Sequence, residues 1–215
     1  MRIGVLGGTF DPIHHGHLII AQEALEALEL ATVIFVPSGR SPHKPADAVT
    51  PGEHRYRMVE LALEDDHRFT ISDIEHRRPG PSYTIDTLRE LSRSLAPEDE
   101  LCFLVGSDTV VELPTWKQIE RFPEFCRLIA ITRPGHPLEH ITSLAGVFPP
   151  ETVEQLRRDA LTIGLVGISA TDIRLKAHQG RSIRYLVPDP VYQYIQEHHL
   201  YCSEAASPAP SGSSN

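Results

Sequence analysis

The stretch "GGTFDPIHHGHL", residues 7–18, directly follows the apolar run "MRIGVL" and holds three glycines and three histidines within twelve positions. An apolar run that ends in two glycines and leads into an amphipathic pattern is typical of a strand, a tight turn and a helix. Open parallel sheets bind ligands at such strand-to-helix turns. We therefore expect a binding site just after Leu6.

The rest of the chain repeats this alternation of short apolar runs with helical patterns. Further strands are predicted at residues 32–36, 101–105 and 128–132, with a weaker one at 69–72. Apolar residues recur every three or four positions between them, first from Leu18 to Leu28 and again from Ile85 to Leu95, which indicates amphipathic helices. The pattern predicts an α/β fold, a Rossmann-like doubly wound parallel sheet with helices on both faces, in other words an α/β/α sandwich.

Length and composition favour one domain. A chain of 215 residues with 40% hydrophobic content buries a core of its own, and we expect a single domain over residues 1–202. Residues 203–215, rich in Ser, Pro and Ala, are predicted to be a disordered tail. Between residues 134 and 167 the hydrophobic periodicity is weak, and it suggests only a polar helix at 151–159 and a strand at 161–166.

Charge and cysteine content exclude several classes of protein. With 20 basic and 29 acidic residues the formal charge is −9, so neither nucleic acid nor an anionic membrane is an expected partner. Three widely spaced cysteines without a Cys-x-x-Cys motif argue against zinc or redox chemistry and favour the cytoplasm. The opening run is too short for a signal peptide, and no apolar run approaches the roughly 20 residues of a membrane helix. The sequence leaves open whether the protein is a homo-oligomer.

The glycine turn has the features of a phosphate-binding site. Gly7 and Gly8 let an anion approach the main chain, and the first turn of the next helix offers unpaired N–H groups at the positive end of its dipole. The order of the glycines differs from the dinucleotide fingerprint G-x-G-x-x-G, and no acidic residue follows at the distance expected for a ribose contact. A hydride-transferring dehydrogenase is thus disfavoured.

His14 and His17 are three positions apart, so in a helix they share one face, with Gly16 leaving the space in front of them open. Both could reach one phosphate, whereas His15 is expected at the surface. Such a pair also arises by chance in a chain with twelve histidines, and its place at the glycine turn is what favours a function.

These residues resemble the H-x-G-H signature of the nucleotidyltransferase superfamily, and in particular the nicotinate-nucleotide adenylyltransferase family. Four further stretches resemble that family in the same order along the chain. They are "PSYTIDTL" from Pro81, "GSDTVVELPTWK" from Gly106, "ISATDIR" from Ile168 and "RSIRYLVPDPVYQYI" from Arg181. One departure is Ala170, where the family usually has a second serine.

The resemblance implies that ATP and nicotinate mononucleotide condense to nicotinate adenine dinucleotide and pyrophosphate, in NAD biosynthesis. Both substrates bring their own reactive groups, so the protein has to position polyanions and neutralise charge rather than supply a nucleophile. The resemblance gives His14, His17 and Arg174 the catalytic role, as groups that bind and stabilise the phosphates. Mg²⁺ is the expected cofactor, held mainly by the ATP phosphates, with no metal ligand assigned to the protein.

The ATP side of the site includes the start of a second helix. In "ISATDIR", Ser169 or Thr171 could cap the helix that carries Arg174, a common structural role that competes with phosphate binding. Asp108 could equally contact a ribose or metal, or cap a helix. The resemblance implies that Ser169, Thr171 and Arg174 contact the ATP phosphates. Arg133 and Lys44 are candidates because each follows a predicted strand, although either could be a solvated surface charge. The residues expected to bind ATP are Gly7, Gly8, Thr9, Phe10, His14, His17, Gly106, Asp108, Arg133, Ser169, Thr171 and Arg174.

The acceptor side includes Trp116, the only tryptophan, which lies in a proline-containing loop next to Lys117. A lone tryptophan is most often a core residue, but one in a loop can stack on a flat ring. The resemblance assigns that ring to the pyridine. Ser82 is expected to cap the helix after it, leaving N–H groups near Tyr83 and Thr84 for a carboxylate. Substrate-binding residues are Lys44, Tyr83, Thr84 and Trp116.

Two alternative hypotheses assign the protein a different function. A sister enzyme with a nicotinamide mononucleotide or phosphopantetheine acceptor, or a cytidylyltransferase, would share the first motif; a phosphopantetheine enzyme or a cytidylyltransferase would lack "LPTWK" and "PSYTIDT". A non-catalytic nucleotide-binding regulator could keep the glycine turn while losing His17 or Arg174, yet both are present. Class I aminoacyl-tRNA synthetases have a similar His-x-Gly-His element, but the chain has no Lys-Met-Ser-Lys-Ser-like loop.

Overall fold

The computed structural model describes residues 1–40, 49–132, 139–164 and 166–202. Their strands form one parallel sheet in the order β3-β2-β1-β4-β5-β6, so the order reverses between β1 and β4. The expectation of a doubly wound parallel sheet is confirmed. The strands are β1 (Arg2–Gly8), β2 (Thr32–Pro37), β3 (Phe69–Ile71), β4 (Glu100–Gly106), β5 (Arg127–Thr132) and β6 (Leu161–Thr162).

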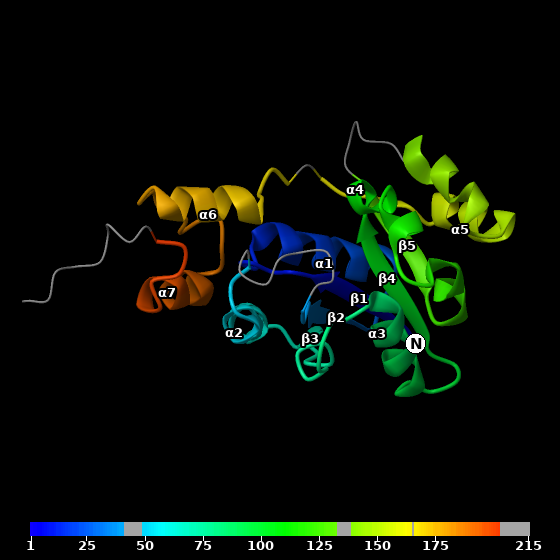
Figure 1. Ribbon diagram of the computed structural model, residues 1–215, viewed down its shortest axis with the longest axis horizontal. Helices are drawn as coiled ribbons and strands as arrows, with labels where there is room; N and C mark the ends of the chain where they lie inside the picture. Colours follow the sequence, from blue (N-terminus) through cyan, green and yellow to red (C-terminus); the bar gives the residue numbers. More distant parts are fainter. Residues whose placement is uncertain (41–48, 133–138, 165, 203–215) are drawn as a thin grey trace, which may run out of the picture.

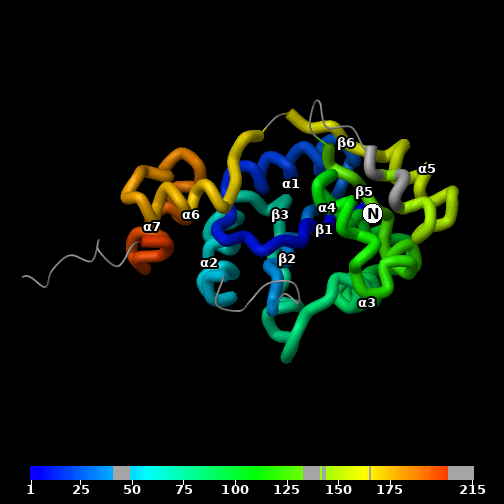
Figure 2. Tube along the Cα trace, turned by 45° about the horizontal axis from the view of Figure 1, so that its top comes forward, coloured from blue at the N-terminus to red at the C-terminus, as the bar shows by residue number. Residues whose placement is uncertain are grey.

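Helices cover both faces of the sheet, as Figures 1 and 2 show. The α-helices are α1 (His15–Ala27), α2 (Gly52–Leu63), α3 (Thr84–Arg93), α4 (Ser107–Val110), α5 (Pro150–Arg158), α6 (Ala170–His178) and α7 (Asp189–Glu197). The described residues also form three 3₁₀ segments, η2 (Leu113–Thr115), η3 (Ile119–Glu124) and η4 (Glu139–Gly146). In both views α6 and α7 lie at one end of the molecule and α5 lies at the opposite end.

Two hydrophobic cores, one on each face, follow from alternation along the strands. In β4, Phe103 and Val105 belong to the core that α3 and α5 cover, whereas Cys102 and Leu104 belong to the core under α1, α2, α6 and α7. Successive side chains of a strand point to opposite faces, so a strand buried on both sides is apolar throughout. This explains why the central strands could be recognised as uninterrupted apolar runs.

The described part of residues 134–167, where the periodicity is weak, contains structure that the sequence pattern did not predict. Residues 139–146 form η4, α5 agrees to within one residue with the helix expected at 151–159, and the strand expected at 161–166 is only Leu161–Thr162. Lys44, Arg133 and the predicted tail 203–215 lie outside the described residues. In the described part of the chain no helix combines the length and apolar character needed to cross a membrane.

Candidate active site

The turn after β1 lies at the carboxyl edge of the sheet, beside the point where the strand order reverses. Phe10 is buried in this turn with a left-handed backbone (φ 48°), and its ring folds back beneath Gly8. A Cβ on Gly8 would lie 3.0 Å from two carbons of that ring. Only glycine leaves this space, so Gly8 and Phe10 together set the path of the turn.

The structure brings His14 and His17 together at the start of α1. His14 is the N-cap residue with an extended backbone, His17 lies in the first turn, and their rings stack with centroids 3.7 Å apart. Gly16 has a different role from the one expected, because a Cβ there would meet His14 Nδ1 at 2.9 Å. Gly16 therefore makes room for the His14 ring itself. His15 is half-exposed, and its backbone N–H donates to the carbonyl of Leu186 (3.1 Å).

Burial keeps both histidine rings neutral near pH 7. Desolvation is the main cause that lowers the pKa of His14 to about 4, and it also holds the pKa of His17 well below its usual range. His17 Nδ1 accepts the backbone N–H of His14 (3.2 Å), which leaves Nε2 to carry the proton. His14 Nδ1 is buried and has no hydrogen-bond partner among the described residues. Both rings are therefore uncharged near pH 7, and His14 Nδ1 is the ring nitrogen that lacks a hydrogen-bond partner among the described residues.

Arg55 supports the turn through hydrogen bonds, and it was not predicted as a site residue. Its guanidinium is buried and donates to the carbonyls of Thr9 (2.8 Å), Ser38 (2.8 Å) and Thr50 (2.9 Å). Thr9 follows β1, and Ser38 and Thr50 lie at the two ends of the connection between β2 and α2, so one side chain joins both connections at the same edge of the sheet. A signal did exist, because Arg55 lies on the face of α2 that carries the buried Met58 and Val59.

Arg174 reaches the same turn from α6. Its Nη1 donates to the carbonyl of Asp11 (2.7 Å), and its Nη2 lies 3.4 Å from Thr171 Oγ1. Of the two caps proposed from the sequence, Ser169 is the one formed, since its Oγ accepts the N–H of Asp172 (3.1 Å). Arg174 thus links α6 to the turn that precedes α1, through the carbonyl of Asp11.

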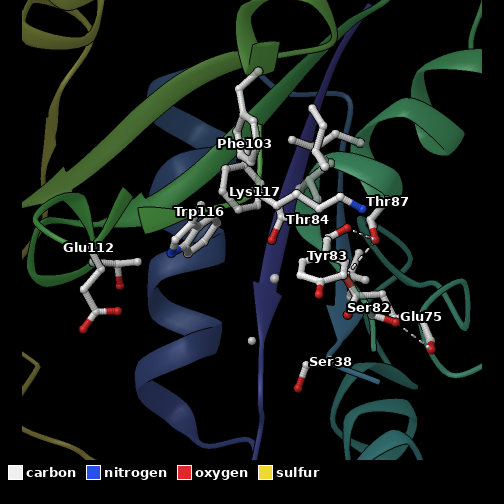
Figure 3. Close-up of a pocket in the computed structure, with 18 of the residues that line it drawn as sticks. Ser38, Glu75, Ser82, Tyr83, Thr84, Thr87, Phe103, Glu112, Trp116 and Lys117 are labelled. Atoms are coloured by element: carbon white, nitrogen blue, oxygen red, sulfur yellow. Dashed lines mark hydrogen bonds between the residues drawn. The ribbon is translucent and has the colours of Figure 1, made fainter. Parts of the chain in front are cut away.

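A pocket of about 510 Å³ opens beside the turn, on the side of α3. Gly7, Gly8 and Thr9 line it from β1 and the turn, Tyr83 and Thr84 line it from the start of α3, and Trp116 lines it from the loop after η2 (Figure 3). The lining does not include His14, His17, Phe10, Ser169, Thr171 or Arg174. The candidate residues therefore form two groups, one that lines the pocket and one at the helix starts of α1 and α6.

The start of α3 faces the pocket, but Ser82 does not cap it as expected. Tyr83 is the N-cap residue, and the Ser82 hydroxyl instead donates to the carbonyl of Glu75 (3.3 Å). Among the described residues the backbone N–H groups of Thr84 and Ile85 have no acceptor. The first turn of α3 thus keeps free donors at the positive end of its dipole.

Trp116 forms the opposite wall. Its indole is half-buried and makes edge contacts with Phe103 and Phe122, with centroids 6.2 and 6.1 Å away. Figure 3 shows Lys117 extending from the same loop toward the start of α3. The Lys117 Nζ lies 3.0 Å from Asp86 Oδ2 and 4.2 Å from the centroid of the Tyr83 ring. A cation therefore lies next to the free donors of α3.

Glu75 is a carboxylate at the pocket that no sequence pattern indicated. Its two oxygens accept the hydroxyl of Thr87 (2.8 Å) and the N–H of Gly39 (3.2 Å).

The segment that follows β4 contains two further candidate residues, Gly106 and Asp108. Gly106 is the N-cap of α4 and Asp108 is exposed in its first turn, so Asp108 does not cap that helix. Neither of these last two residues lines the pocket, although Thr109 and Glu112 from the same segment do.

Comparison with known sequences shows the family of this chain. Residues 5–176 match the family model described as cytidylyltransferase-like. The chain is 49% identical over 202 residues to a probable nicotinate-nucleotide adenylyltransferase of Thermus thermophilus, covering 94% of this chain and 100% of that relative. It is 46% identical to a protein of the same description from Leifsonia xyli, covering 95% of this chain and 96% of that one.

A solved structure shares the fold at low sequence identity. It is the Plasmodium falciparum nicotinic acid mononucleotide adenylyltransferase complexed with NaAD, with a TM-score of 0.70 and 19% identity over 93% of this chain and 97% of that one. The extent and level of the sequence matches decide the assignment. This chain belongs to the cytidylyltransferase-like family and, within it, to the nicotinate-nucleotide adenylyltransferases.

Proposed function

We propose that the protein transfers the adenylyl group of ATP to nicotinate mononucleotide, a step of NAD biosynthesis. A phosphate oxygen of the mononucleotide attacks the α-phosphorus of ATP, the bond from that phosphorus to the bridging oxygen breaks, and pyrophosphate leaves. The observation that carries the proposal is the 510 Å³ pocket, which joins an aromatic wall and a helix start with free donors beside the glycine turn. The names of relatives at 49% and 46% identity support it.

The pocket fits the acceptor. The pyridine ring stacks on Trp116, and its carboxylate meets the backbone N–H groups of Thr84 and Ile85. An acceptor-only anion suits donors at a helix N-terminus, where the dipole adds about 0.3–1 kcal/mol per charge at an exposed site. The Lys117 ammonium strengthens the positive potential at this end of the pocket. Tyr83 closes the pocket above the ring.

The nucleotide fits the helix starts of α1 and α6. The neutral His14 and His17 rings donate N–H groups to the phosphates, and Arg174 supplies a fixed positive charge next to the turn. Donors that are already oriented stabilise the charge that develops on the transferring phosphoryl group and on pyrophosphate. The remaining nucleotide contacts that we assign are Gly7, Gly8, Thr9, Phe10, Gly106, Asp108, Ser169 and Thr171.

Bound phosphates also affect the protonation of His14 and His17. An anion beside His14 and His17 favours their protonated forms, so the pKa values of both rings rise when ATP binds. The Nδ1 of His14, buried without a partner among the described residues, gains one. Lys44 and Arg133 lie outside the described residues, and we keep them as candidate contacts of the acceptor and of ATP because they follow β2 and β5 in the sequence.

Mg²⁺ is the proposed cofactor. Within the described ranges no group of three His, Cys, Asp or Glu side chains is placed to hold a metal ion. The donors at the turn are imidazoles and a guanidinium, which suit phosphate oxygens rather than Mg²⁺. The ion fits as a companion of ATP, held mainly by phosphates and water, and it neutralises phosphate charge when bound. The buried free thiols of Cys102 and Cys126 support a cytoplasmic location.

The test is pyrophosphate release from ATP and Mg²⁺ with a panel of acceptors: nicotinate mononucleotide, nicotinamide mononucleotide and 4′-phosphopantetheine. We expect release with the nicotinate form and a product with the mass of nicotinate adenine dinucleotide. Release only with phosphopantetheine, or none with any acceptor, would contradict the proposal.

A further inference from the structure

The end of the described chain folds back onto the turn after β1. After α7, His199 and Tyr201 both adopt left-handed backbone conformations, with φ 50° and 65°. Non-glycine residues keep such conformations where the surrounding structure holds them. The contact that holds Tyr201 is its hydroxyl, which donates to Asp11 Oδ1 at 2.6 Å across a separation of 190 residues.

Asp11 is a buried carboxylate joined to three distant segments. Besides the Tyr201 hydroxyl, it accepts the N–H of Thr50 on Oδ2 (3.2 Å) and the guanidinium of Arg174 on its backbone carbonyl (2.7 Å). Its exposure is 4%, and Arg55 holds the neighbouring carbonyls of Thr9 and Thr50. The direction of the Asp11 carbonyl therefore depends on how its own side chain is held.

We infer that Tyr201 is a positioning residue of the nucleotide site: its hydroxyl fixes Asp11, and the carbonyl of Asp11 in turn fixes the Arg174 guanidinium toward the ATP phosphates. The inference rests on the proposed function, because it takes Arg174 to meet ATP. Tyr201 does not line the 510 Å³ pocket, so it acts on the nucleotide and leaves the acceptor alone. Desolvation, followed by the neighbouring Asp11 charge, raises the pKa of Tyr201, which keeps the phenol protonated as a donor.

The substitution Tyr201→Phe removes only the hydroxyl. The ring stays packed in the core under α2 and α7, and Arg55 still anchors the loops on both sides of Asp11, so the variant is expected to fold. Loss of one hydrogen bond to a charged acceptor is expected to weaken binding of a non-hydrolysable ATP analogue about 5- to 20-fold. The KM for the mononucleotide should stay within about twofold of wild type, since its pocket is untouched.

Calorimetry with the analogue measures the first quantity without any acceptor, and initial rates measure the second. Tyr185→Phe is the matched control, because Tyr185 is 85% exposed and makes none of the hydrogen bonds that join Asp11 to Thr50, Arg174 and Tyr201, and it should bind like wild type. A chain ending at Cys202 should also bind like wild type, since Tyr201 remains. Wild-type protein that fails to bind the analogue would overturn the proposed function itself, which separates that failure from a failure of this inference.

A double-mutant cycle separates positioning from general loss of structure. If Tyr201 acts through Arg174, Tyr201→Phe has no further effect on analogue affinity in an Arg174→Ala background. Additive losses, equal losses for both substrates, or an affinity of Tyr201→Phe within twofold of wild type would each overturn the inference.

Discussion

Replacing Gly16 by alanine tests whether the position of the His14 ring matters for catalysis. The new Cβ would lie 2.9 Å from His14 Nδ1, 3.0 Å from its Cε1 and 3.4 Å from Val166 Cγ1. Carbon atoms pack best about 3.5–4.0 Å apart, so the ring has to move by roughly half an ångström or more. It cannot move freely, because its other face stacks on His17 at 3.7 Å.

The expected result is a loss of activity without a loss of stability. A displacement of about 1 Å in a catalytic group can lower the rate by about 10²-fold, so we expect kcat to fall about 10- to 100-fold. Alanine is better than glycine in a helix by up to about 1 kcal/mol, which offsets the repacking of the ring and keeps the thermal midpoint within a few degrees of wild type.

Steady-state kinetics and thermal unfolding of the same preparations measure both effects. His15→Ala, in the same helical turn, is the control and should change neither. A Gly16→Ala protein that keeps its stability and turns over at near wild-type kcat would refute the reasoning. A large drop in stability would refute it as well, since the steric conflict would then act on the fold rather than on the ring.

Three further outcomes follow from the geometry. His17→Ala should lower kcat by about 10²–10³, the loss typical of a missing transition-state donor, with circular dichroism unchanged; the role fails if His15→Ala loses as much. Arg174→Ala should raise the KM for ATP at least about tenfold and the KM for the mononucleotide much less, and the reverse ranking would move α6 to the acceptor side. Because the pKa of His14 falls from 6.5 to about 4 on folding, its contribution to stability is complete above pH 6.5 and is lost as the pH falls toward 4. That loss amounts to about 2 kcal/mol by pH 5; urea unfolding should show it in wild type, and equal pH dependence in His14→Gln would contradict it.

The fold could be predicted where periodicity was strong. The central strands are buried on both faces and read as continuous apolar runs, and α3 shows a clear apolar stripe at Ile85, Leu88 and Leu91. On the two sides of α5, η4 and the extent of β6 could not be predicted, because β6 has two residues and η4 is a 3₁₀ segment that lacks the 3.6-residue period.

The parts of the site at element ends could also be predicted from the sequence. His14, Thr84 and Ser169 lie at helix starts, where local patterns carry information. The error at Ser82 has a tertiary cause, since the Glu75 carbonyl takes its hydroxyl and the helix begins one residue later than expected.

Other parts depend on contacts that no local pattern reveals. Asp11 is joined to Thr50, Arg174 and Tyr201 across 39, 163 and 190 residues. Arg55 joins the connections that follow β1 and β2, which meet only after the sheet has formed. Such contacts depend on the positions of whole elements, and a single sequence gives no spacing rule for them.

The ratio of kcat/KM for nicotinate mononucleotide to that for nicotinamide mononucleotide tests the central claim most directly. The two acceptors differ only in a carboxylate and an amide, and both rings can stack on Trp116. At the start of α3 the amide would turn its NH₂ group toward the N–H donors of Thr84 and Ile85. A donor left unpaired in this way costs about 1–3 kcal/mol, so we predict a preference for the nicotinate form of about tenfold to a few hundredfold. Equal values, or a preference for the amide, would contradict the account of the acceptor pocket.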